Sequence, residues 1–221
     1  MQKRGPLVEQ VHENVELVDL SCKRIAQSIP RLAHYMRKER PKAIIATSEH
    51  ANVALVLARM MSFTRTNVIL RIGIAFSVVF GRYKKRRDKL IATLAPVLYR
   101  RADKIVCVSE GIAEDFARET GIARDRLIVI HNPKDIEHIR TRAKEKVTHP
   151  WFAQKTFPVV LGVGRLRGQK DFATLIEAVA LARKDISDLH LIILGEGEEH
   201  DALIKLAEKE GVADAVDLPG F

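Results

Sequence analysis

The sequence predicts an α/β fold built on parallel β-sheets. Short runs rich in Val and Ile recur along the chain, and helix-like stretches separate them. Runs of this kind, bounded by helices, are typical of strands in a parallel sheet that is buried on both faces. Local helix signals agree with this interpretation: Ser109 can cap a helix whose first turn contains Glu110, and Gly121 is placed to end that helix.

The elements of the first half follow this alternation in order. They are predicted helices over residues 21–39, 51–61 and 89–101, and predicted strands over residues 43–46, 68–70, 104–108 and 127–130. In open parallel sheets, ligands bind beyond the carboxyl ends of the strands. Ser109 and Glu110 follow one such end, and His131 and Asn132 follow another, so all four are candidate cleft residues. The cap already explains Ser109, and a purely structural His131 is the alternative.

Residues 132–158 interrupt the alternation. This segment opens with Asn-Pro, is densely charged over residues 140–146, and holds the only tryptophan. We interpret residues 134–157 as a linker with a short helix, between a first domain over residues 1–133 and a second that begins at residue 158. A surface loop within one domain is the alternative interpretation.

A second α/β unit occupies residues 158–221. Its predicted strands span residues 159–163, 189–194 and 215–218, and its predicted helices span residues 172–184 and 198–210. The sequence stops soon after the last strand, which leaves that strand uncovered, whereas proteins normally protect such an edge. We therefore expect this domain to be only the first part of a larger one.

The strongest chemical signal follows the strand over residues 159–163. Gly164 lets the backbone approach a ligand closely, while Arg165 and Lys170 place two cations beside it. Arginine grips phosphate with two parallel hydrogen bonds and lysine acts as a point charge. The pattern therefore favours a diphosphate site. A solvated loop stays open as the alternative, because the run matches neither a Walker loop nor GxGxxG.

A second glycine-containing loop follows the strand over residues 189–194. Gly195 and Gly197 suit a tight turn, and Glu196 between them can accept hydrogen bonds from a ribose or a base. A turn that carries a helix-initiating acid explains the same residues.

Composition and charge narrow the function further. Apolar residues make up 47% of the chain and charged residues 29%, which is typical of a globular protein and excludes collagen, mucin and a disordered tail. The net charge is +9; residues 1–150 carry 29 basic and 16 acidic residues, a net charge of +13, and residues 151–221 carry 8 and 12, a net charge of −4. This asymmetry indicates that the first half has an anionic partner.

A basic cluster in the first half is a candidate membrane or acceptor patch. It follows the apolar residues 74–80 and consists of Arg82, Lys84, Lys85, Arg86 and Arg87. Such cations next to apolar residues can bind an anionic membrane surface, and a solvated face is the alternative. Nucleic acid is not expected as a partner, because aromatic residues, the usual stacking platforms, make up only 5% of the chain.

Cysteine and histidine usage predicts neither disulfides nor a metal. Two cysteines are too few for a disulfide framework, and no Cys/His cluster is present. No stretch approaches the ~18 apolar residues of a membrane-spanning helix, and the start lacks the apolar core of a signal peptide. We expect a cytoplasmic protein, at most peripheral at the inner face of the cell membrane, with no metal and no cofactor.

In this order, the motifs resemble the family 4 glycosyltransferases, retaining enzymes of the GT-B type with two Rossmann-like domains. The densest similarity lies in VVLGVGRLRGQKDFATLIEAVALAR and LHLIILGEGEEHDALIKLAEKEGVADAVDLPGF, and upstream in YRRADKIVCVSEGIAEDFARETGIARDRLIVIHNPKDIEHI. The resemblance is dense over residues 98–221 and loose over residues 21–97. It implies two Rossmann-like domains, an acceptor-side one followed by one that binds the nucleotide-sugar.

The resemblance also implies roles for the candidate residues. Arg165 and Lys170 match the pair that neutralises the donor diphosphate and stabilises the leaving nucleotide. Gly164 lets the backbone approach the phosphates, and the loop Gly195-Glu196-Gly197 lies toward the nucleoside. His131 and Asn132 fall where the domains meet, and the linker becomes a hinge whose closure excludes water.

The chain also departs from the family pattern. It begins after the family's first strand and glycine-rich loop, and it ends at Phe221, before the Glu-x7-Glu motif that contacts the donor sugar and ribose. Where many members have a histidine after a first-domain strand, this sequence reads Arg71-Ile72-Gly73-Ile74. We therefore expect both domains to be incomplete and the polypeptide as given to be inactive alone.

The resulting functional hypothesis is transfer of a sugar from a nucleotide-sugar, used as a co-substrate, to a hydroxyl of a glycan or lipid-linked acceptor in cell-envelope polysaccharide or glycolipid synthesis. The alternative is a non-catalytic nucleotide-binding or interaction remnant of such an enzyme.

Overall fold

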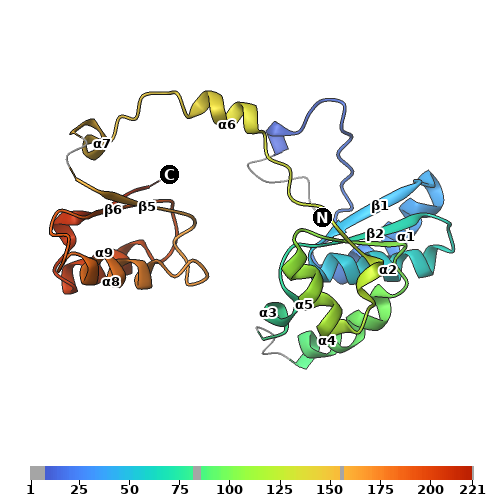
Figure 1. Cartoon of the computed structure of the whole chain (residues 1–221). Coiled ribbons are helices and arrows are strands. Elements are labelled where there is room, and N and C mark those ends of the chain that lie inside the picture. Colours follow the sequence, from blue (N-terminus) through green and yellow to red (C-terminus); the bar gives the residue numbers. More distant parts are fainter. Residues whose placement is uncertain (1–7, 82–85, 155–156, 221) are drawn as a thin grey trace. The chain divides into compact units, whose positions relative to one another are not determined.

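The chain folds into two compact units, which are described separately. The computed structural model describes residues 8–81, 86–154 and 157–220, without the side chains of residues 10, 80–92 and 153–154. Unit 1 is Met1–Lys134 and unit 2 is Asp135–Phe221. Each contains a parallel sheet with helices packed against it (Figure 1), so the predicted α/β class is confirmed.

Unit 1 is built on a four-stranded parallel sheet in the order β1-β2-β3-β4. Its strands are β1 (Ala43–Thr47), β2 (Asn67–Ile72), β3 (Lys104–Cys107) and β4 (Leu127–Val129). Its helices are α1 (Ile25–Glu39), α2 (Glu49–Ser62), α3 (Phe76–Gly81), α4 (Arg86–Tyr99) and α5 (Glu110–Thr120), with short 3-10 turns η1 (Val8–Gln10) and η2 (Arg124–Arg126). The register pairs Ile44 with Val68 and Leu70 with Ile105.

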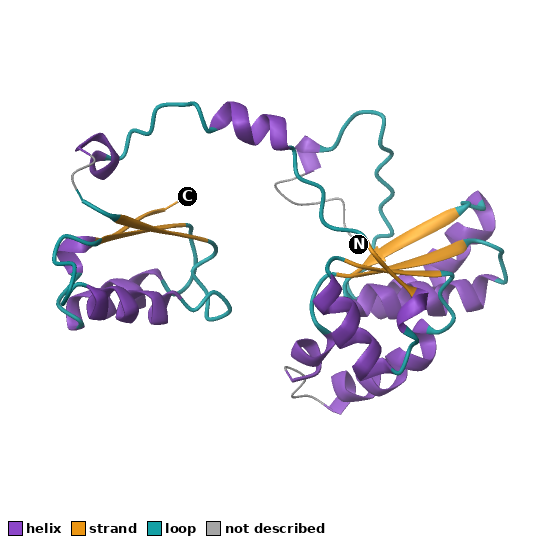
Figure 2. Cartoon of the chain, in the orientation of Figure 1, coloured by secondary structure: helices purple, strands orange, loops and turns teal. Residues whose placement is uncertain are grey.

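The helices of unit 1 lie on one face of its sheet (Figure 2). On that face Val68 and Leu70 have no exposed surface and Ile72 is buried. The strands follow one another in sheet order, and right-handed crossovers between such strands place every connecting helix on the same side. The core of unit 1 therefore lies between the sheet and this single helical layer.

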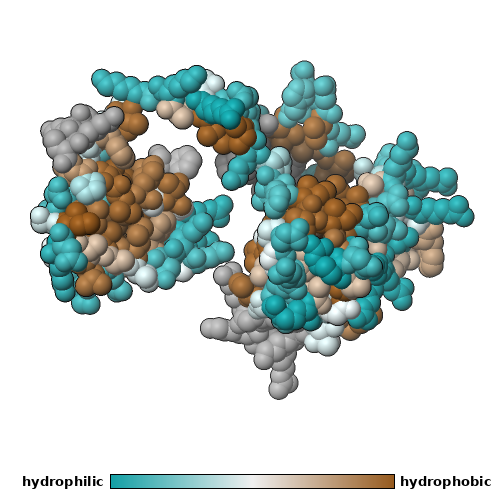
Figure 3. All heavy atoms as spheres, viewed as in Figure 1, coloured by the Kyte–Doolittle hydropathy of each residue, from teal (hydrophilic) through white to brown (hydrophobic). Residues whose placement is uncertain are grey.

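The expectation that both faces of the sheet are buried is not met among the described residues of unit 1. Ile45 of β1 is 64% exposed, and Ile130, just after β4, is 56% exposed. Figure 3 shows hydrophobic residues gathered on the visible side of this unit. The sequential strand order explains the difference, because it brings no crossover helix to this second face.

Local signals set the ends of α5 as the sequence predicts. The Ser109 hydroxyl accepts a hydrogen bond from the backbone N–H of Ile112 at 3.3 Å, and Gly121 adopts φ = 65° at the carboxyl end.

Helix α3, by contrast, was not predicted from the sequence. Its Phe76 joins Tyr99 and Phe116 in an aromatic cluster of the core, with ring centroids 5.4 Å apart for Phe76 and Phe116 and 5.8 Å apart for Tyr99 and Phe116.

Unit 2 contains a three-stranded parallel sheet in the order β5-β6-β7. Its strands are β5 (Val159–Val163), β6 (His190–Leu194) and β7 (Val216–Gly220), and its helices are α6 (Ile136–Arg142), α7 (Pro150–Gln154), α8 (Phe172–Ala182) and α9 (His200–Lys209), with the 3-10 turn η3 (Ala213–Ala215). Helices α8 and α9 cover one face of the sheet (Figure 1). Phe172, Ile176 and Leu203 contribute to the core beneath it.

Two short helices, not one, lie within residues 134–157. Helix α6 is exposed along its length, including Ile136 and Ile139. Helix α7 is held to unit 2: the Nε2 atom of His149, which precedes it, lies 2.8 Å from a carboxylate oxygen of Asp217, and the rings of Trp151 and His190 are 4.6 Å apart. The second part of this segment is thus anchored to the sheet of unit 2.

Candidate functional site

The predicted donor loop lies at the carboxyl end of β5. Leu166 is completely buried and anchors the loop in the core, whereas its neighbours Arg165 and Arg167 are exposed. Tight turns follow, in which the backbone N–H of Lys170 donates to the carbonyl of Arg167 at 2.8 Å. The buried Leu166 thus anchors the loop in the core, while the cations on either side of it are exposed.

The loop after β6 is joined to this donor loop by backbone hydrogen bonds. The N–H of Gly164 donates to the carbonyl of Leu194 at 2.9 Å, and the N–H of Leu166 donates to the carbonyl of Glu196 at 3.0 Å. The N–H of Glu199 donates back to the carbonyl of Leu166 at 3.2 Å. We call this pair of loops, residues 164–171 and 195–199, the paired loops.

The close approach of the paired loops explains the two glycines of the second loop. A Cβ atom at Gly195 would lie 1.8 Å from the carbonyl oxygen of Gly164, and one at Gly197 would lie 2.3 Å from the carbonyl oxygen of Leu166. No side chain fits at either position without moving the backbone opposite. This packing requirement, which the sequence did not indicate, accounts for both glycines without a ligand.

Arg165 and Lys170 are exposed, and neither forms an ion pair within the part of the chain that the structure describes. The stem of Lys170 lies against Gly164, where an added Cβ would be 3.0 Å from its Cε atom. Arg167 is 3.9 Å from a carboxylate oxygen of Glu198. The two predicted cations are therefore brought to one short loop, with their charges free for an anionic ligand.

In unit 1, Ser109 and Glu110 have structural partners. Ser109 caps α5, and Glu110 forms an ion pair with Arg124 of η2. Burial raises the pKa of the neighbouring Cys107 thiol to about 11; the charge of Arg124 lowers it and that of Glu110 raises it. Both candidate residues thus have partners within unit 1, and their place in a ligand cleft stays a prediction.

His131 and Asn132 lie beyond the carboxyl end of β4, and both are exposed. The Nδ1 atom of His131 is 3.1 Å from the carbonyl oxygen of Val108. The Asn132 side-chain oxygen accepts a hydrogen bond from the Arg71 guanidinium at 2.5 Å. Sequence reasoning did not select Arg71 as a site residue, although a cation at the end of the apolar strand β2 was the available signal.

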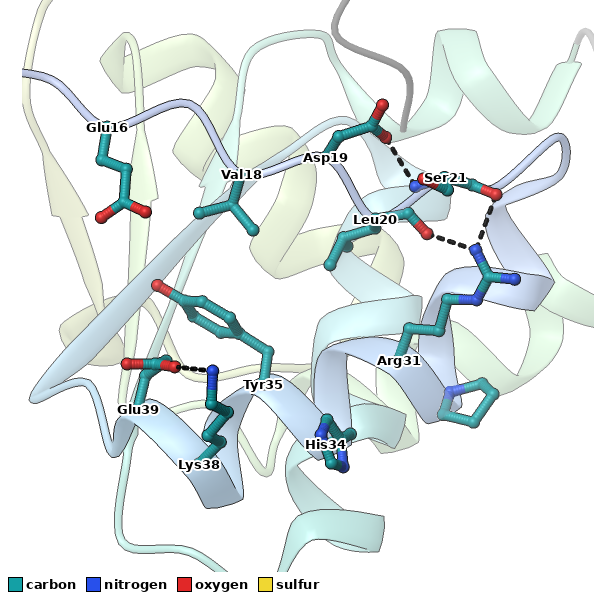
Figure 4. A pocket seen from close by; sticks show the side chains of 11 residues that line it. Glu16, Val18, Asp19, Leu20, Ser21, Arg31, His34, Tyr35, Lys38 and Glu39 are labelled. Atoms are coloured by element: carbon teal, nitrogen blue, oxygen red, sulfur yellow. Dashed lines mark hydrogen bonds and ion pairs between the residues drawn. The ribbon is translucent and has the colours of Figure 1, made fainter.

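A groove of about 650 Å³ lies elsewhere in unit 1, between residues 16–21 and α1 (Figure 4). Two of the cations that line it have partners within the chain. Arg31 donates to the carbonyls of Leu20 and Ser21 at 2.5 and 2.6 Å, and Lys38 pairs with Glu39 at 3.1 Å. The groove includes none of the residues that the sequence selected.

Family comparison decides the identity of the chain. The model of Glycosyltransferase Family 4 matches residues 2–138, and that of Glycosyl transferases group 1 matches residues 143–221. The chain belongs to glycosyltransferase family 4. The predicted family is confirmed.

Among curated proteins, the chain is similar to the N-acetylgalactosamine-N,N'-diacetylbacillosaminyl-diphospho-undecaprenol 4-alpha-N-acetylgalactosaminyltransferase of Campylobacter jejuni. The two are 31% identical over 172 residues, which are 77% of this chain and 44% of that protein. The lipopolysaccharide core biosynthesis glycosyltransferase LpsE of Rhizobium meliloti is 37% identical over 123 residues, 56% of this chain and 33% of that protein. The chain thus spans less than half the length of these relatives.

Solved structures confirm the fold. The lipopolysaccharide outer core galactosyltransferase WaaB aligns with a TM-score of 0.61 at 20% identity, over 92% of this chain and 50% of that one. The sucrose-phosphate synthase of Thermosynechococcus elongatus aligns with a TM-score of 0.65 at 14% identity, over 96% of this chain and 54% of that one. The predicted GT-B fold class of two Rossmann-like domains is therefore supported.

Some of the sequence predictions fall outside the described structure of the glycosyltransferase. Arg82, Lys84 and Lys85 lie outside the described residues, and the side chains of Arg86 and Arg87 are not described. Within the described residues, no group of three potential ligands could hold a metal ion. The described helices include none that is long and apolar enough to cross a membrane.

Proposed function

We propose that the protein transfers a sugar from a nucleotide-sugar donor to a hydroxyl of a glycan or lipid-linked acceptor, in cell-envelope polysaccharide or glycolipid synthesis. The observation that carries the proposal is the pair Arg165 and Lys170, held on one rigid loop at the carboxyl end of a parallel sheet without ion-pair partners among the described residues. Parallel α/β sheets bind ligands at this end. Membership of the glycosyltransferase family makes a nucleotide diphosphate the fitting ligand.

In this proposal the two cations act on the leaving group. As the bond between the sugar and the diphosphate breaks, negative charge builds up on the phosphate oxygens. Arg165 can hold two of these oxygens at once, and Lys170 adds a second positive charge. Charges placed in advance where negative charge develops lower the barrier. The side chains thereby supply the positive charge themselves, with the nucleotide-sugar as co-substrate and no separate cofactor.

The remaining parts of the proposal concern stereochemistry, the acceptor and the place of action. Retention of the anomeric configuration is supported by the family resemblance. Unit 1 is proposed to bind the acceptor, and the part of residues 134–157 that precedes His149, the start of the anchored part, to act as the hinge. The similar Campylobacter jejuni and Rhizobium meliloti proteins are named for a diphospho-undecaprenol substrate and for lipopolysaccharide core synthesis. With the +13 charge of residues 1–150, these names support action in the cytoplasm, peripheral to the inner face of the membrane.

Calorimetric titration of the purified protein with UDP-, GDP- and ADP-sugars tests the donor site. The variant R165Q/K170Q is expected to bind the preferred donor more weakly by roughly 1.5–3 kcal/mol for each charged hydrogen bond lost. Lys209→Gln, which removes an exposed charge from α9, is the matched control and is expected to bind normally. Unchanged donor binding in R165Q/K170Q would refute the site. Donor binding without transfer to any acceptor would favour a non-catalytic nucleotide-binding module.

A further inference from the structure

Arg71 occupies a defined position at the carboxyl end of the unit 1 sheet. In the sheet register it lies between Thr47 of β1 and Val106 of β3. Its neighbours Leu70 and Ile72 are buried beneath the helices, so by the alternation of a strand the Arg71 side chain projects from the opposite, helix-free face. The buried Asn52 of α2 donates to the Arg71 carbonyl at 3.4 Å, which fixes the backbone here.

The guanidinium of Arg71 lacks a counter-charge within the described structure. Its hydrogen bond goes to the neutral side-chain oxygen of Asn132, and no carboxylate of the described residues pairs with it. Three other arginines of unit 1 pair with carboxylates, namely Arg59, Arg118 and Arg124, whereas Arg31 and Arg126 donate to backbone carbonyls. Arg71 is also only partly exposed. A guanidinium has five N–H donors, so donors of Arg71 remain available to an anion.

Asn132 lies beside this cation, and His131 precedes it in the chain at the end of β4; together they offer hydrogen-bond donors and an acceptor. Because the Asn132 oxygen accepts from Arg71, its amide N–H groups are the donors left for a ligand. The Val108 carbonyl can only accept, so the hydrogen bond to His131 places the proton on Nδ1. In the neutral ring, Nε2 is then an acceptor for a hydroxyl.

We propose that Arg71, Asn132 and His131 form an acceptor subsite that recognises a phosphate group on the acceptor. The Arg71 guanidinium holds phosphate oxygens, the Asn132 amide donates to the same group, and Nε2 of His131 accepts a hydrogen bond from an acceptor hydroxyl. The +13 charge of residues 1–150 favours a multiply charged phosphate over a single carboxylate. The inference deepens the proposed function, on which the acceptor role of unit 1 rests.

The phosphate site is tested by calorimetric titration with inorganic pyrophosphate. The titration uses the R165Q/K170Q background, which lacks the two proposed donor-binding cations, so that failure of the donor assignment leaves this measurement intact. Adding Arg71→Gln is expected to weaken pyrophosphate binding by about tenfold or more. Arg71→Lys, which keeps the charge but loses the planar fork, is expected to restore part of the affinity. Circular dichroism checks that both variants remain folded.

Lys104→Gln is the matched control, because Lys104 is an exposed cation at the amino end of the neighbouring strand β3. It is expected to bind pyrophosphate like the background. Equal loss in Lys104→Gln and Arg71→Gln would indicate general attraction to the basic surface and overturn the subsite, as would normal binding in Arg71→Gln.

A second measurement separates an acceptor phosphate from a membrane headgroup. Co-sedimentation with vesicles of phosphatidylcholine and phosphatidylglycerol is expected to be the same for Arg71→Gln as for its background, because the proposed ligand is the phosphate of the acceptor. If Arg71→Gln abolished vesicle binding and left pyrophosphate binding unchanged, Arg71 would be a headgroup contact, and the acceptor subsite would be wrong.

Discussion

Replacing Gly195 by alanine tests whether the paired loops of unit 2 hold each other in position. The new methyl carbon would lie 1.8 Å from the carbonyl oxygen of Gly164 and 2.8 Å from its carbonyl carbon. Both are backbone atoms, so no side-chain rotation relieves the contact. Gly195 also has φ = 147°, a conformation that residues with a Cβ rarely adopt. The substitution therefore combines backbone strain with overpacking.

The expected cost follows from these two effects. Strain at an unfavourable φ costs about 1–3 kcal/mol, and overpacking costs a similar amount. A loss of roughly 2–6 kcal/mol is a large part of the ~5–15 kcal/mol that stabilises a typical domain. Gly211→Ala is the matched control: Gly211 has φ = 70°, but no atom lies within 4 Å of an added Cβ. It should lose only the left-handed strain, about 1–2 kcal/mol.

Urea unfolding followed by tryptophan fluorescence measures both variants. Trp151 is the only tryptophan of the chain, and its ring packs against His190 of unit 2, so its emission reports on this unit. Because the methyl group presses on Gly164, relief of the contact also displaces the neighbouring Arg165. Donor binding by the folded variant, measured without urea, should therefore also weaken. Equal destabilisation of Gly195→Ala and Gly211→Ala would refute the proposed contact between the loops.

Two further predictions concern buried titratable groups of unit 1. Burial acts to raise the pKa of Asp115, but hydrogen bonds from Ser77 and Phe76 and the charge of Arg118 outweigh it, so the pKa is lowered from 3.8. The carboxylate therefore stabilises the fold above about pH 4 and loses this contribution as the pH falls through its lowered folded pKa. Asp115→Asn should lower the free energy of unfolding by about 1–3 kcal/mol at neutral pH. Urea titrations should show the difference in unfolding free energy between the wild type and the variant shrinking in acid, whereas a difference independent of pH would contradict the assignment. The second group is the Cys107 thiol, whose pKa is raised to about 11. At pH 8 it should react with iodoacetamide about 100-fold more slowly than in the unfolded chain, and peptide mapping by mass spectrometry measures both rates. Equal rates would be inconsistent with the burial of Cys107.

The elements that could be predicted from sequence are those with local causes. Ser109 and Gly121 bound α5 because a cap and a left-handed stop each act within a few residues. Helix α3 was missed because its start depends on a distant residue: the backbone N–H of Ser77 donates to the Asp115 carboxylate at 3.1 Å. The helix-free second face of the sheet was missed for a related reason, since strand order is not a local property of the sequence.

The residues of the candidate site also divide into those whose position follows from the local sequence and those whose position depends on the fold. Arg165 and Lys170 lie five residues apart on one loop, so their shared position could be inferred from their spacing after a strand. The hydrogen bond between Arg71 and Asn132 joins residues 61 positions apart, and only the pairing of β2, β3 and β4 brings them together. Gly195 looked like an ordinary turn glycine, whereas its constraint comes from Gly164 on another loop.

The charge distribution explains why the two proposed anion sites need different supports. Residues 151–221 carry a net charge of −4, so Arg165 and Lys170 can attract a diphosphate only at contact range, and their positions must be held firmly. The paired loops, joined by backbone hydrogen bonds and closed by two glycines, provide that rigidity. Residues 1–150 carry +13, a field that acts over about a Debye length, ~8 Å at physiological salt, and steers an anionic acceptor before contact. Under the proposed acceptor assignment, a single arginine oriented by a neutral amide is enough in unit 1, because the surrounding charge supplies the attraction and Arg71 has only to select the phosphate.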